Sequence, residues 1–472
     1  MKFRVDEIVA ATGGRLLAGR PEAPAGDVNT DTRTLASGQT FLAIRGERFD
    51  GHDFLEEAAR RGASCLVTAR EDKVSRVASG PAVILVRDTL EALADLGRAA
   101  RGRLTCPVIA VTGSCGKTTV KEMVGQVLGR RLKGRAPPAS FNNQVGVPLT
   151  LLAAEEDDGF LVCEFGTNSP GEIARLVDIG RPTIAVVTLV APVHLEGLGS
   201  VGGVAREKAA LVEGLGPDGV AILNVDDPHV AAMAGRCRGR TVKVGSDEAA
   251  DLRMDDLIQT ERGLLFTLVP AGAAGEPPVG FEVPVLGRHQ ATLAALASAA
   301  AREAGVTLEE SAAALRKFRP PPMRLALVEA GGVTVVNDAY NANPRSMEAA
   351  LDLLALWPDR RKVFFCGDMR ELGAESRAAH EALGRQIVEA GVKRLVCVGT
   401  ESRATADAAV AAGLARGAVM ALADSAAAAA EARRLVRDGD VVLVKGSRAT
   451  RMERVAEAIL ESRQSGARVV HE

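Results

Sequence analysis

Residues 106–130, CPVIAVTGSCGKTTVKEMVGQVLGR, decide the fold of the middle of this chain. The apolar run that ends at Thr112 is typical of a buried strand, and the glycines after it are typical of a tight turn. The remainder repeats apolar residues at the spacing of one helix face. These residues are Val120, Met123, Val124, Val127 and Leu128. The stretch therefore predicts a strand, a glycine-rich loop over 113–118 and an amphipathic helix.

The same alternation of an apolar run with a helical pattern recurs along the chain. The runs are FLVCEFG (160–166), TIAVVTLV (183–190) and GVAILNV (219–225), then VTVVND (333–338), KVFFCGD (362–368), RLVCVG (394–399) and DVVLVKG (440–446). Such alternation predicts parallel sheets covered by helices. FRPPPMR (318–324) separates the two series, and three consecutive prolines cannot continue a helix. We expect three α/β domains over residues 1–87, 88–318 and 319–472.

The composition excludes several classes of protein. With 472 residues, 58 Lys+Arg against 60 Asp+Glu, and 3% aromatic residues, the chain lacks the basic surface and stacking platforms of a nucleic-acid binder. Its seven cysteines form no C-x-x-C pair, so neither a disulfide framework nor a zinc site is indicated. The N-terminus is too charged for a signal peptide, and no apolar run is long enough to span a membrane. We expect a monomeric, cytoplasmic protein.

The loop TGSCGKTT (112–119) has the composition of a phosphate-binding loop. Its glycines let backbone N–H groups surround phosphates, Lys117 reaches the β- and γ-phosphates, and the Thr118 hydroxyl suits Mg²⁺. The general pattern also requires a glycine at 111, where this chain has Val111. A glycine turn that merely caps a helix is the less favoured alternative, because a strand and a helix flank the loop. The predicted ATP-binding residues here are Gly113, Ser114, Cys115, Gly116, Lys117, Thr118 and Thr119.

Two further residues follow neighbouring strands. Glu164 ends the run FLVCE, where a phosphate-loop protein needs a second acid for its metal, although a solvated strand-end acid is the alternative. His194 follows the next run, and a lone histidine there is more often structural than a metal ligand. Cys115 fits either a reactive thiol at a helix N-terminus or a small packed residue.

Nine motifs in fixed order carry a resemblance to a known family. They are TGSCGKTT, NNQVGVPLTLL, CEFGTNSPGEI, HLEGLGSVGGVAREKAAL, AILNVDDP, GRHQATLAAL, NDAYNANPRSM, GDMRELG and KGSR. From about Thr30 to about Arg448 the chain resembles the Mur ligases of peptidoglycan synthesis, whose phosphate loop has this shortened form. The resemblance implies an N-terminal domain for a uridine diphosphate sugar, a central ATPase and a Rossmann-like C-terminal domain.

The resemblance also implies roles for individual residues. Lys117, Glu164, His194 and Lys208 would be catalytic, and Thr118, Glu164, His194 and Lys208 would hold Mg²⁺, with Lys208 as a carbamate. Carbamylation replaces a positive charge by a carboxylate-like group with two oxygen ligands. Gln290, Arg324 and Asp338 would bind ATP, but Leu293 stands where the family has an asparagine for adenine. The expected substrate-binding residues are Thr32, Arg33, Asn142, Asn143, Thr167, Asn168, Tyr340, Asn341, Lys445, Ser447 and Arg448.

The resemblance is greatest to family members that join D-alanyl-D-alanine to UDP-N-acetylmuramoyl-tripeptide through an acyl phosphate made with ATP. A sister ligase that adds a single amino acid is the nearest alternative, and NDAYNANP in place of D-N-P-R argues against it. Folylpolyglutamate synthase has its phosphate loop near the N-terminus, unlike this chain. A regulatory P-loop ATPase, or a non-catalytic nucleotide-binding scaffold, has no evident use for the His194 and Lys208 pair.

Overall fold

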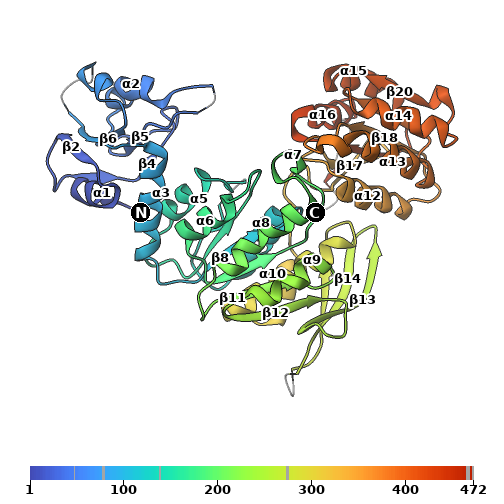
Figure 1. Cartoon of the computed structure of the whole chain (residues 1–472). Coiled ribbons are helices and arrows are strands. Elements are labelled where there is room, and N and C mark those ends of the chain that lie inside the picture. Colours follow the sequence, from blue (N-terminus) through green and yellow to red (C-terminus); the bar gives the residue numbers. More distant parts are fainter. Residues whose placement is uncertain (47, 77–79, 138–139, 273–275, 464–467, 470–472) are drawn as a thin grey trace.

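Three α/β domains follow one another along the chain (Figure 1). The computed structural model describes residues 1–46, 48–76, 80–137, 140–272, 276–463 and 468–469. In Figure 1 the N-terminal domain (blue) and the C-terminal domain (orange and red) stand apart above the central domain (green and yellow). The predicted three-domain α/β architecture is confirmed, whereas the boundaries after residues 87 and 318 stay predictions.

The N-terminal domain is built on a small mixed sheet in the order β2-β7-β6-β5-β4, in which β2 runs antiparallel and the others parallel. Its strands are β2 (Arg15–Ala18), β4 (Val28–Asn29), β5 (Thr40–Leu42), β6 (Cys65–Thr68) and β7 (Ala82–Leu85). Helices α1 (Val5–Thr12) and α2 (Leu55–Arg60) and the strand pair of β1 (Phe3–Arg4) and β3 (Pro24–Gly26) complete it.

Helix α3 (Thr89–Arg103) connects the first two domains. Asp88 caps it, because its carboxylate accepts hydrogen bonds from the backbone N–H groups of Leu90 and Glu91. The helix packs against α1 on one side and against α5 (Gly146–Ala153) and α6 (Glu172–Gly180) on the other. Burial of α3 in both domains fixes the direction in which the N-terminal domain leaves the central one.

The central sheet has the order β15-β14-β13-β12-β11-β10-β8-β9 and is parallel from β9 to β13. Its strands are β8 (Val108–Thr112), β9 (Leu161–Glu164), β10 (Ile184–Val187), β11 (Val220–Asn224), β12 (Arg240–Gly245), β13 (Leu252–Thr260), β14 (Gly263–Pro270) and β15 (Val279–Val283). The strands expected at β8 to β11 are confirmed. The sequence pattern did not reveal that β13, β14 and β15 form an antiparallel extension.

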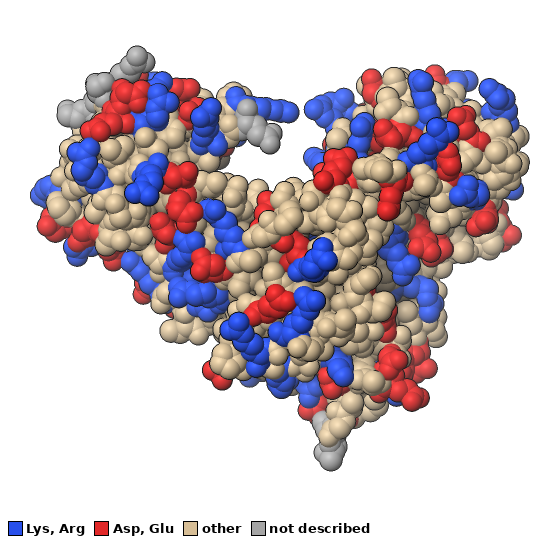
Figure 2. Space-filling view, viewed as in Figure 1, with Lys and Arg blue, Asp and Glu red and all other residues tan. Residues whose placement is uncertain are grey.

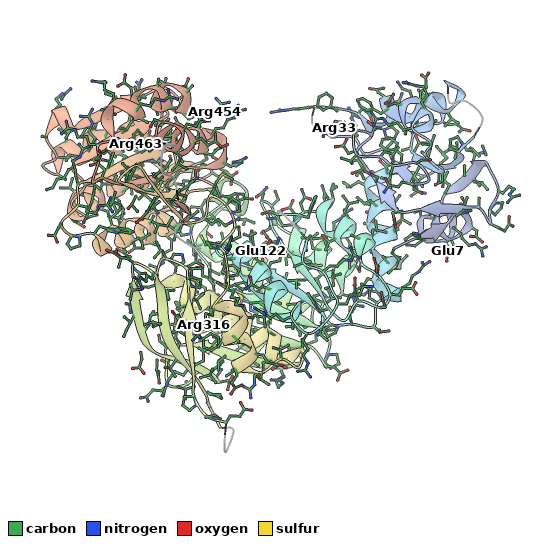
Figure 3. All side chains as sticks on the ribbon, turned by 180° about the vertical axis from the view of Figure 1, so that it is seen from behind. Glu7, Arg33, Glu122, Arg316, Arg454 and Arg463 are labelled. Atoms are coloured by element: carbon green, nitrogen blue, oxygen red, sulfur yellow. The ribbon has the colours of Figure 1, made fainter. Side chains whose placement is uncertain are left out.

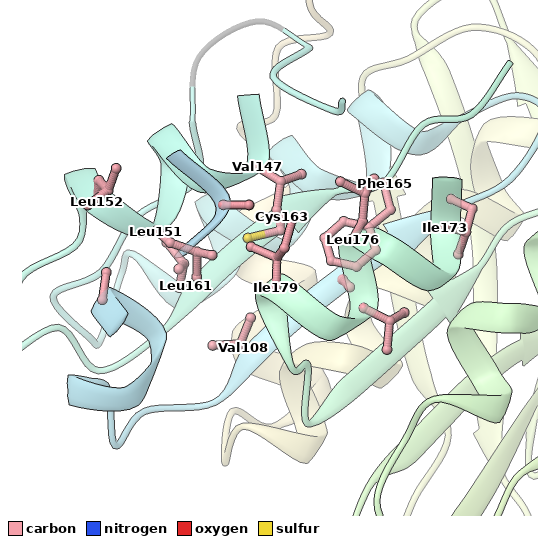
Figure 4. Packing of buried hydrophobic residues seen from close by; sticks show 14 of the residues in the cluster. Val108, Val147, Leu151, Leu152, Leu161, Cys163, Phe165, Ile173, Leu176 and Ile179 are labelled. Carbon is pink, nitrogen blue, oxygen red and sulfur yellow. The ribbon is translucent and has the colours of Figure 1, made fainter. Parts of the chain in front are cut away.

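Helices cover both faces of the parallel strands. Val108 and Ala110 of β8 contribute to the cluster under α3, α5, α6 and α8 (Val201–Glu213), whereas Ile109 and Val111 contribute to the cluster under α4, α10 and α11. The latter helices span Lys117–Leu128, His289–Glu303 and Leu308–Leu315. Figure 4 shows the first cluster, where Ile179 of α6 lies beside Cys163 of β9 and Leu176 lies beside Phe165. Each such fully buried side chain stabilises the fold by about 1.5–3 kcal/mol.

The predicted helix after the phosphate loop is α4, and all five of its predicted apolar residues are buried. Helix α4 begins at Lys117, so the loop ends at Gly116, two residues earlier than the sequence predicted. Two short helices, α7 (Leu195–Leu198) and α9 (Pro228–Ala231), follow β10 and β11 on the side of the C-terminal domain.

The C-terminal sheet has the order β20-β19-β18-β21-β17-β16-β22, parallel from β20 to β17. Its strands are β16 (Ala326–Ala330), β17 (Val333–Asp338), β18 (Lys362–Gly367), β19 (Arg394–Val398), β20 (Val419–Leu422), β21 (Val441–Lys445) and β22 (Arg468–Val469). Helices α12 (Pro344–Leu353), α13 (Ser376–Glu389) and α14 (Ser402–Ala411) cover one face, and α15 (Ser425–Leu435) and α16 (Glu453–Glu461) the other. The strands expected at β17, β18, β19 and β21 are confirmed.

Both parallel sheets place their loops at one edge. The phosphate loop follows β8, which has β9 on one side and β10 on the other, so it lies where the strand order reverses. Open α/β sheets bind ligands at such a point, outside the carboxyl ends of the strands. Across the described residues, no helix is long and apolar enough to cross a membrane.

Candidate functional site

A cleft of about 1280 Å³ lies between the central and C-terminal domains. Most of the predicted site residues line it: Ser114, Cys115, Gly116, Lys117, Thr118, Thr119, Asn142, Asn143, Glu164, Thr167, Asn168, His194, Gln290, Arg324, Asp338, Tyr340, Asn341 and Lys445. The remaining predicted residues do not line it: Thr32, Arg33, Gly113, Lys208, Ser447 and Arg448. The fold therefore gathers residues from all parts of the chain after β8, but not those of the N-terminal domain.

The phosphate loop is held open by its glycines. Gly116, with φ +83°, precedes α4 and gives it no side-chain cap, so the first N–H groups of the helix stay available for an anion. The Lys117 ammonium donates to the Gly113 carbonyl at 2.8 Å, across the mouth of the loop. Ser114 N–H donates to the Leu189 carbonyl at 2.8 Å, which fixes the loop to the segment after β10. This geometry suits a bound polyphosphate.

We expect Gly113→Ala to destabilise the protein by about 3 kcal/mol and to abolish nucleotide binding. Gly113 has φ +147°, and an added Cβ would lie 1.8 Å from the Thr188 hydroxyl oxygen. Urea unfolding and ADP titration measure the two effects. Gly417→Ala is the control, because a Cβ there meets no atom within 4 Å. ADP affinity within three-fold of wild type in the Gly113 variant would contradict the prediction.

Thr118 and Glu164 form an oxygen-rich pair beside the loop. The Thr118 hydroxyl donates to Glu164 Oε2 at 2.8 Å, and the Asn142 amide donates to Glu164 Oε1 at 2.9 Å. Hydroxyl and carboxylate oxygens are ligands that Mg²⁺ prefers, and a hydrogen-bonded second oxygen keeps the carboxylate oriented. These residues fit the predicted metal.

His194 lies at the boundary between the two domains. It has φ +53°, and its Nδ1 contacts Oε2 of Glu371, in the loop after β18 of the C-terminal domain. The Leu195 N–H donates to the Glu371 carbonyl at 3.1 Å. The hydrogen bond to His194 holds the pKa of Glu371 below its ordinary value. Only Nε2 of His194 is therefore available to a ligand in the cleft.

Lys208 is buried in α8, with 1% of its surface exposed. It has no ion-pair partner among the residues that the structure describes. Burial and the neighbouring charge of Lys117 lower the pKa of Lys208 to about 7. The protonated amine would repel a metal cation. The neutral amine is the form that adds CO₂, and the resulting carbamate would offer a cation two oxygen ligands.

We expect Lys208→Met to be more stable than wild type at pH 7 in CO₂-free buffer, by on the order of 2 kcal/mol. The pKa of Lys208 is about 7 in the folded protein and 10.5 ordinarily, so between these values the unfolded chain binds more protons. The stability of wild type therefore rises with pH across this window, and the difference from the variant shrinks towards pH 10. Chemical unfolding at pH 6, 7, 8 and 9 measures it. A constant difference over that range would contradict the assigned pKa.

The strand-end loops of the C-terminal domain converge on Asp338 and Lys445. The Lys445 ammonium donates to Asp338 Oδ2 at 2.5 Å and to the Asn341 carbonyl at 3.0 Å. Burial raises the pKa of Asp338 above its ordinary value, and the charge of Lys445 opposes the rise. Ser447 supports the loop after β18, since its hydroxyl accepts from Arg370 N–H at 2.9 Å, and Arg448 pairs with Glu453 outside the cleft.

Thr32 and Arg33 lie in the N-terminal domain, outside the cleft that contains the phosphate loop. Figure 2 shows a hollow between the N-terminal and C-terminal domains, with Lys and Arg side chains on both of its rims. Figure 3 places Arg33 on one rim and Arg454 on the other. The Arg33 side chain is 86% exposed and pairs with Asp31 at 2.6 Å. Thr32 and Arg33 therefore belong to a separate surface.

Comparison with known proteins identifies the family. The chain matches "Mur ligase family, catalytic domain" over residues 27–101, "Mur ligase middle domain" over 111–301 and "Mur ligase, glutamate ligase domain" over 323–448. The chain belongs to the Mur ligase family. It is 36% identical over 441 residues to the UDP-N-acetylmuramoyl-tripeptide–D-alanyl-D-alanine ligase of Escherichia coli (strain K12). The aligned region covers 92% of this chain and 94% of that protein.

Solved structures of Mur ligases resemble the whole chain. The MurF crystal structure from Acinetobacter baumannii is 29% identical, with a TM-score of 0.88 over 98% of this chain and 99% of that one. The MurF ligase from Thermotoga maritima in complex with ADP is 26% identical, with a TM-score of 0.79 over 93% and 98% of the two chains. The predicted fold of a Mur ligase is confirmed at the level of all three domains.

Two residues of this Mur ligase site were missed from the sequence. Ser140 contacts both the Thr118 and Tyr340 hydroxyls, and Glu371 contacts His194. Ser140 lies two residues before the quoted motif NNQVGVPLTLL, and Glu371 lies inside GDMRELG. The motifs marked the right segments, but nothing in the sequence indicated which distant residue each side chain contacts.

Proposed function

We propose that this chain is an ATP-dependent ligase that joins D-alanyl-D-alanine to UDP-N-acetylmuramoyl-tripeptide. One observation carries the proposal: a phosphate loop and the strand-end loops of a second α/β domain line the same cleft, in a chain related over nearly its whole length to ligases of that name. The ADP complex of the Thermotoga maritima relative supports a nucleotide in this cleft. The surface that carries half-buried Thr32 and exposed Arg33 would receive the uridine diphosphate, whose phosphates suit the fork of an arginine.

The proposed chemistry activates a carboxylate for attack by an amine. The terminal carboxylate of the tripeptide attacks the γ-phosphorus of ATP, the bond to the bridging oxygen breaks, and ADP leaves with the electron pair. The amino group of D-alanyl-D-alanine then attacks the acyl carbon, loses a proton, and expels inorganic phosphate. Phosphoryl transfer depends on positioning and charge neutralisation, which Lys117 and the N-terminus of α4 would supply.

Magnesium would be held by Thr118 and Glu164, and a second ion by His194 and a carbamylated Lys208. Bound there, magnesium would neutralise the charge that develops on the phosphoryl oxygens. The chain's own contribution is to hold these ligands in place. Asn142 orients Glu164, and Glu371 fixes the ring of His194 from the C-terminal domain. The loop that carries Glu371 would therefore have to contact His194 before His194 could bind magnesium.

Gln290 and Leu293 would have different roles on α10. The Gln290 Oε1 atom is buried without a hydrogen-bond partner among the described residues, so it is available to an N–H donor such as the adenine amino group. Leu293 packs against the phosphate loop, because a Cβ on Gly116 would lie 2.6 Å from its Cδ2. Leu293, which stands where the family has an asparagine, thus packs against the phosphate loop and offers adenine no hydrogen bond.

We expect Gln290→Leu to weaken ATP binding about 10-fold while raising the melting temperature of the free protein slightly. The change removes a buried unpaired oxygen, which favours folding, and removes the proposed partner of adenine, which disfavours binding. Calorimetric titration and thermal melting measure the two opposite effects. Unchanged ATP affinity, or equal losses for ATP and GTP, would contradict the assignment.

Phosphate release with Mg-ATP and the sugar nucleotide tests the proposed function. Release should require D-alanyl-D-alanine, and mass spectrometry should find a product heavier by one dipeptide less water. Stimulation by a single amino acid instead would identify a sister ligase. Release without either substrate would favour a plain ATPase.

A further inference from the structure

We propose that Tyr340 is a positioning residue that fixes Arg324 against the phosphate loop and connects the C-terminal domain to Glu164. The inference rests on the proposed function for the identity of the nucleotide. It also reassigns Tyr340, the only tyrosine of the chain, from the substrate-binding role expected from the sequence. The contacts of Met323, Arg324 and Leu325 support this inference.

The segment around Arg324 is held in an unusual backbone conformation. Met323 and Leu325, on either side of it, both have left-handed φ values, +61° and +52°. Such a conformation costs free energy for residues other than glycine and persists where surrounding contacts impose it. The contacts come from the end of β17 and from the loop after it. The Tyr340 N–H donates to the Met323 carbonyl at 3.2 Å, and the Leu325 N–H donates to Asp338 Oδ1 at 3.1 Å.

The side chains continue this arrangement. The Arg324 guanidinium carbon lies 4.0 Å from the centre of the Tyr340 ring, within the range of a cation–π contact. From there its Nη2 donates to the Thr118 hydroxyl oxygen at 2.9 Å. A flexible arginine stacked on a ring has fewer accessible rotamers, so the ring directs the guanidinium at the first turn of α4.

The Tyr340 hydroxyl begins a chain of hydrogen bonds whose direction can be assigned. Glu164 as a carboxylate only accepts, so the Thr118 hydroxyl spends its single proton on Glu164 Oε2. The Ser140 hydroxyl, 3.3 Å from Thr118, must therefore donate to it. Ser140 then has no proton left for Tyr340, so the Tyr340 hydroxyl donates to Ser140 at 2.9 Å. The phenol at position 340 thus supplies both the ring beside Arg324 and the proton donated to Ser140, whereas phenylalanine would keep the ring and lose the donor.

This arrangement places the Arg324 guanidinium beside Thr118, where the phosphate loop meets α4. Lys117 and Thr118 of such a loop face the β- and γ-phosphates and their metal. Loss of Tyr340 should therefore weaken binding of a triphosphate more than binding of a diphosphate. It should act only through Arg324 and Ser140.

A double-mutant cycle in nucleotide binding tests the proposal without the other substrates. We expect Tyr340→Leu to weaken β,γ-imido-ATP about 10-fold and ADP less than 2-fold, so that ADP binding also reports folding. In an Arg324→Ala background, Tyr340→Leu should weaken imido-ATP only about 3-fold, which is the share of the effect that Ser140 carries. Tyr340→Phe keeps the ring and loses the donor, so it should weaken imido-ATP about 3-fold. Ser140→Ala should weaken it by the same factor, and the double variant should bind no more weakly than either single variant.

Different results would overturn the proposal. Multiplicative effects of Tyr340→Leu and Arg324→Ala would mean that Tyr340 touches the nucleotide itself. An unchanged imido-ATP affinity with a raised KM for D-alanyl-D-alanine would restore the substrate-binding role. The binding cycle is independent of ligation, so a protein that completes it without forming product would refute the proposed function and leave this inference standing.

Discussion

Lys117→Ala should lower kcat/KM for phosphate release by ~10³-fold or more. Lys117 is the cation of the phosphate loop, and its ammonium lies across the loop mouth on the Gly113 carbonyl. Its loss removes the cation that we propose to face the β- and γ-phosphates, so both ATP affinity and turnover should fall. Initial rates and ADP titration measure the effect.

The matched control is Lys133→Ala. Lys133 does not line the cleft, and its side chain is 53% exposed, beside Glu155 and Asp157. Exposed ion pairs of this kind contribute about 0–1 kcal/mol, so the control should keep wild-type activity. A Lys117→Ala enzyme within 10-fold of wild type would mean that the nucleotide binds elsewhere.

Removal of CO₂ should lower the activity of the wild-type enzyme by ~10²-fold or more, and bicarbonate should restore it. The proposed carbamate on Lys208 forms from the neutral amine, and a pKa of about 7 makes that form predominant at pH 8. Below pH 7 the protonated amine prevails, so carbamylation and activity should fall together. Mass spectrometry or ¹³C NMR with labelled bicarbonate detects the modification directly.

Lys208→Met separates the carbamate from a general effect of CO₂. This variant should lose activity to the same extent as the CO₂-depleted enzyme, and bicarbonate should not restore it. Its stability at neutral pH should be at least that of wild type, so unfolding does not explain the loss. Activity of wild type that is independent of CO₂ at pH 8 would exclude the carbamate.

Much of the fold followed from local patterns. The strands β8 to β11 and β17, β18, β19 and β21 were readable because strands buried on both faces are continuous apolar runs. The helix α4 was readable from its 3.6-residue period. The antiparallel strands β13 to β15 were missed, although their exposed positions alternate with buried ones and the Gly- and Pro-rich stretch PAGAAGEPPVG (270–280) between β14 and β15 is typical of a hairpin connection.

Parts of the site were equally local. A glycine-rich loop between a strand and a helix makes an anion site from its own backbone, so TGSCGKTT indicated its chemistry without any distant residue. Glu164 was predicted from its place at the end of the neighbouring strand, and the structure places it in the cleft beside the loop. Position 293 was identified as a departure, but its role required the structure, which packs Leu293 against Gly116.

By itself, the sequence determined the order of the domains and the family, because each of the nine motifs is a short local pattern and their order along the chain identifies the whole. The residues of the phosphate loop were predicted in the same way, from one strand, one glycine-rich turn and one helix. Only the tertiary structure decided that Tyr340 bonds to Ser140, 200 residues earlier, that Arg324 reaches Thr118 over 206 residues, and that Glu371 holds His194. Packing of two separate sheets sets these contacts. A hydrogen bond depends on distances of a few ångströms between side chains, and no local pattern of residues encodes the orientation of one domain against another.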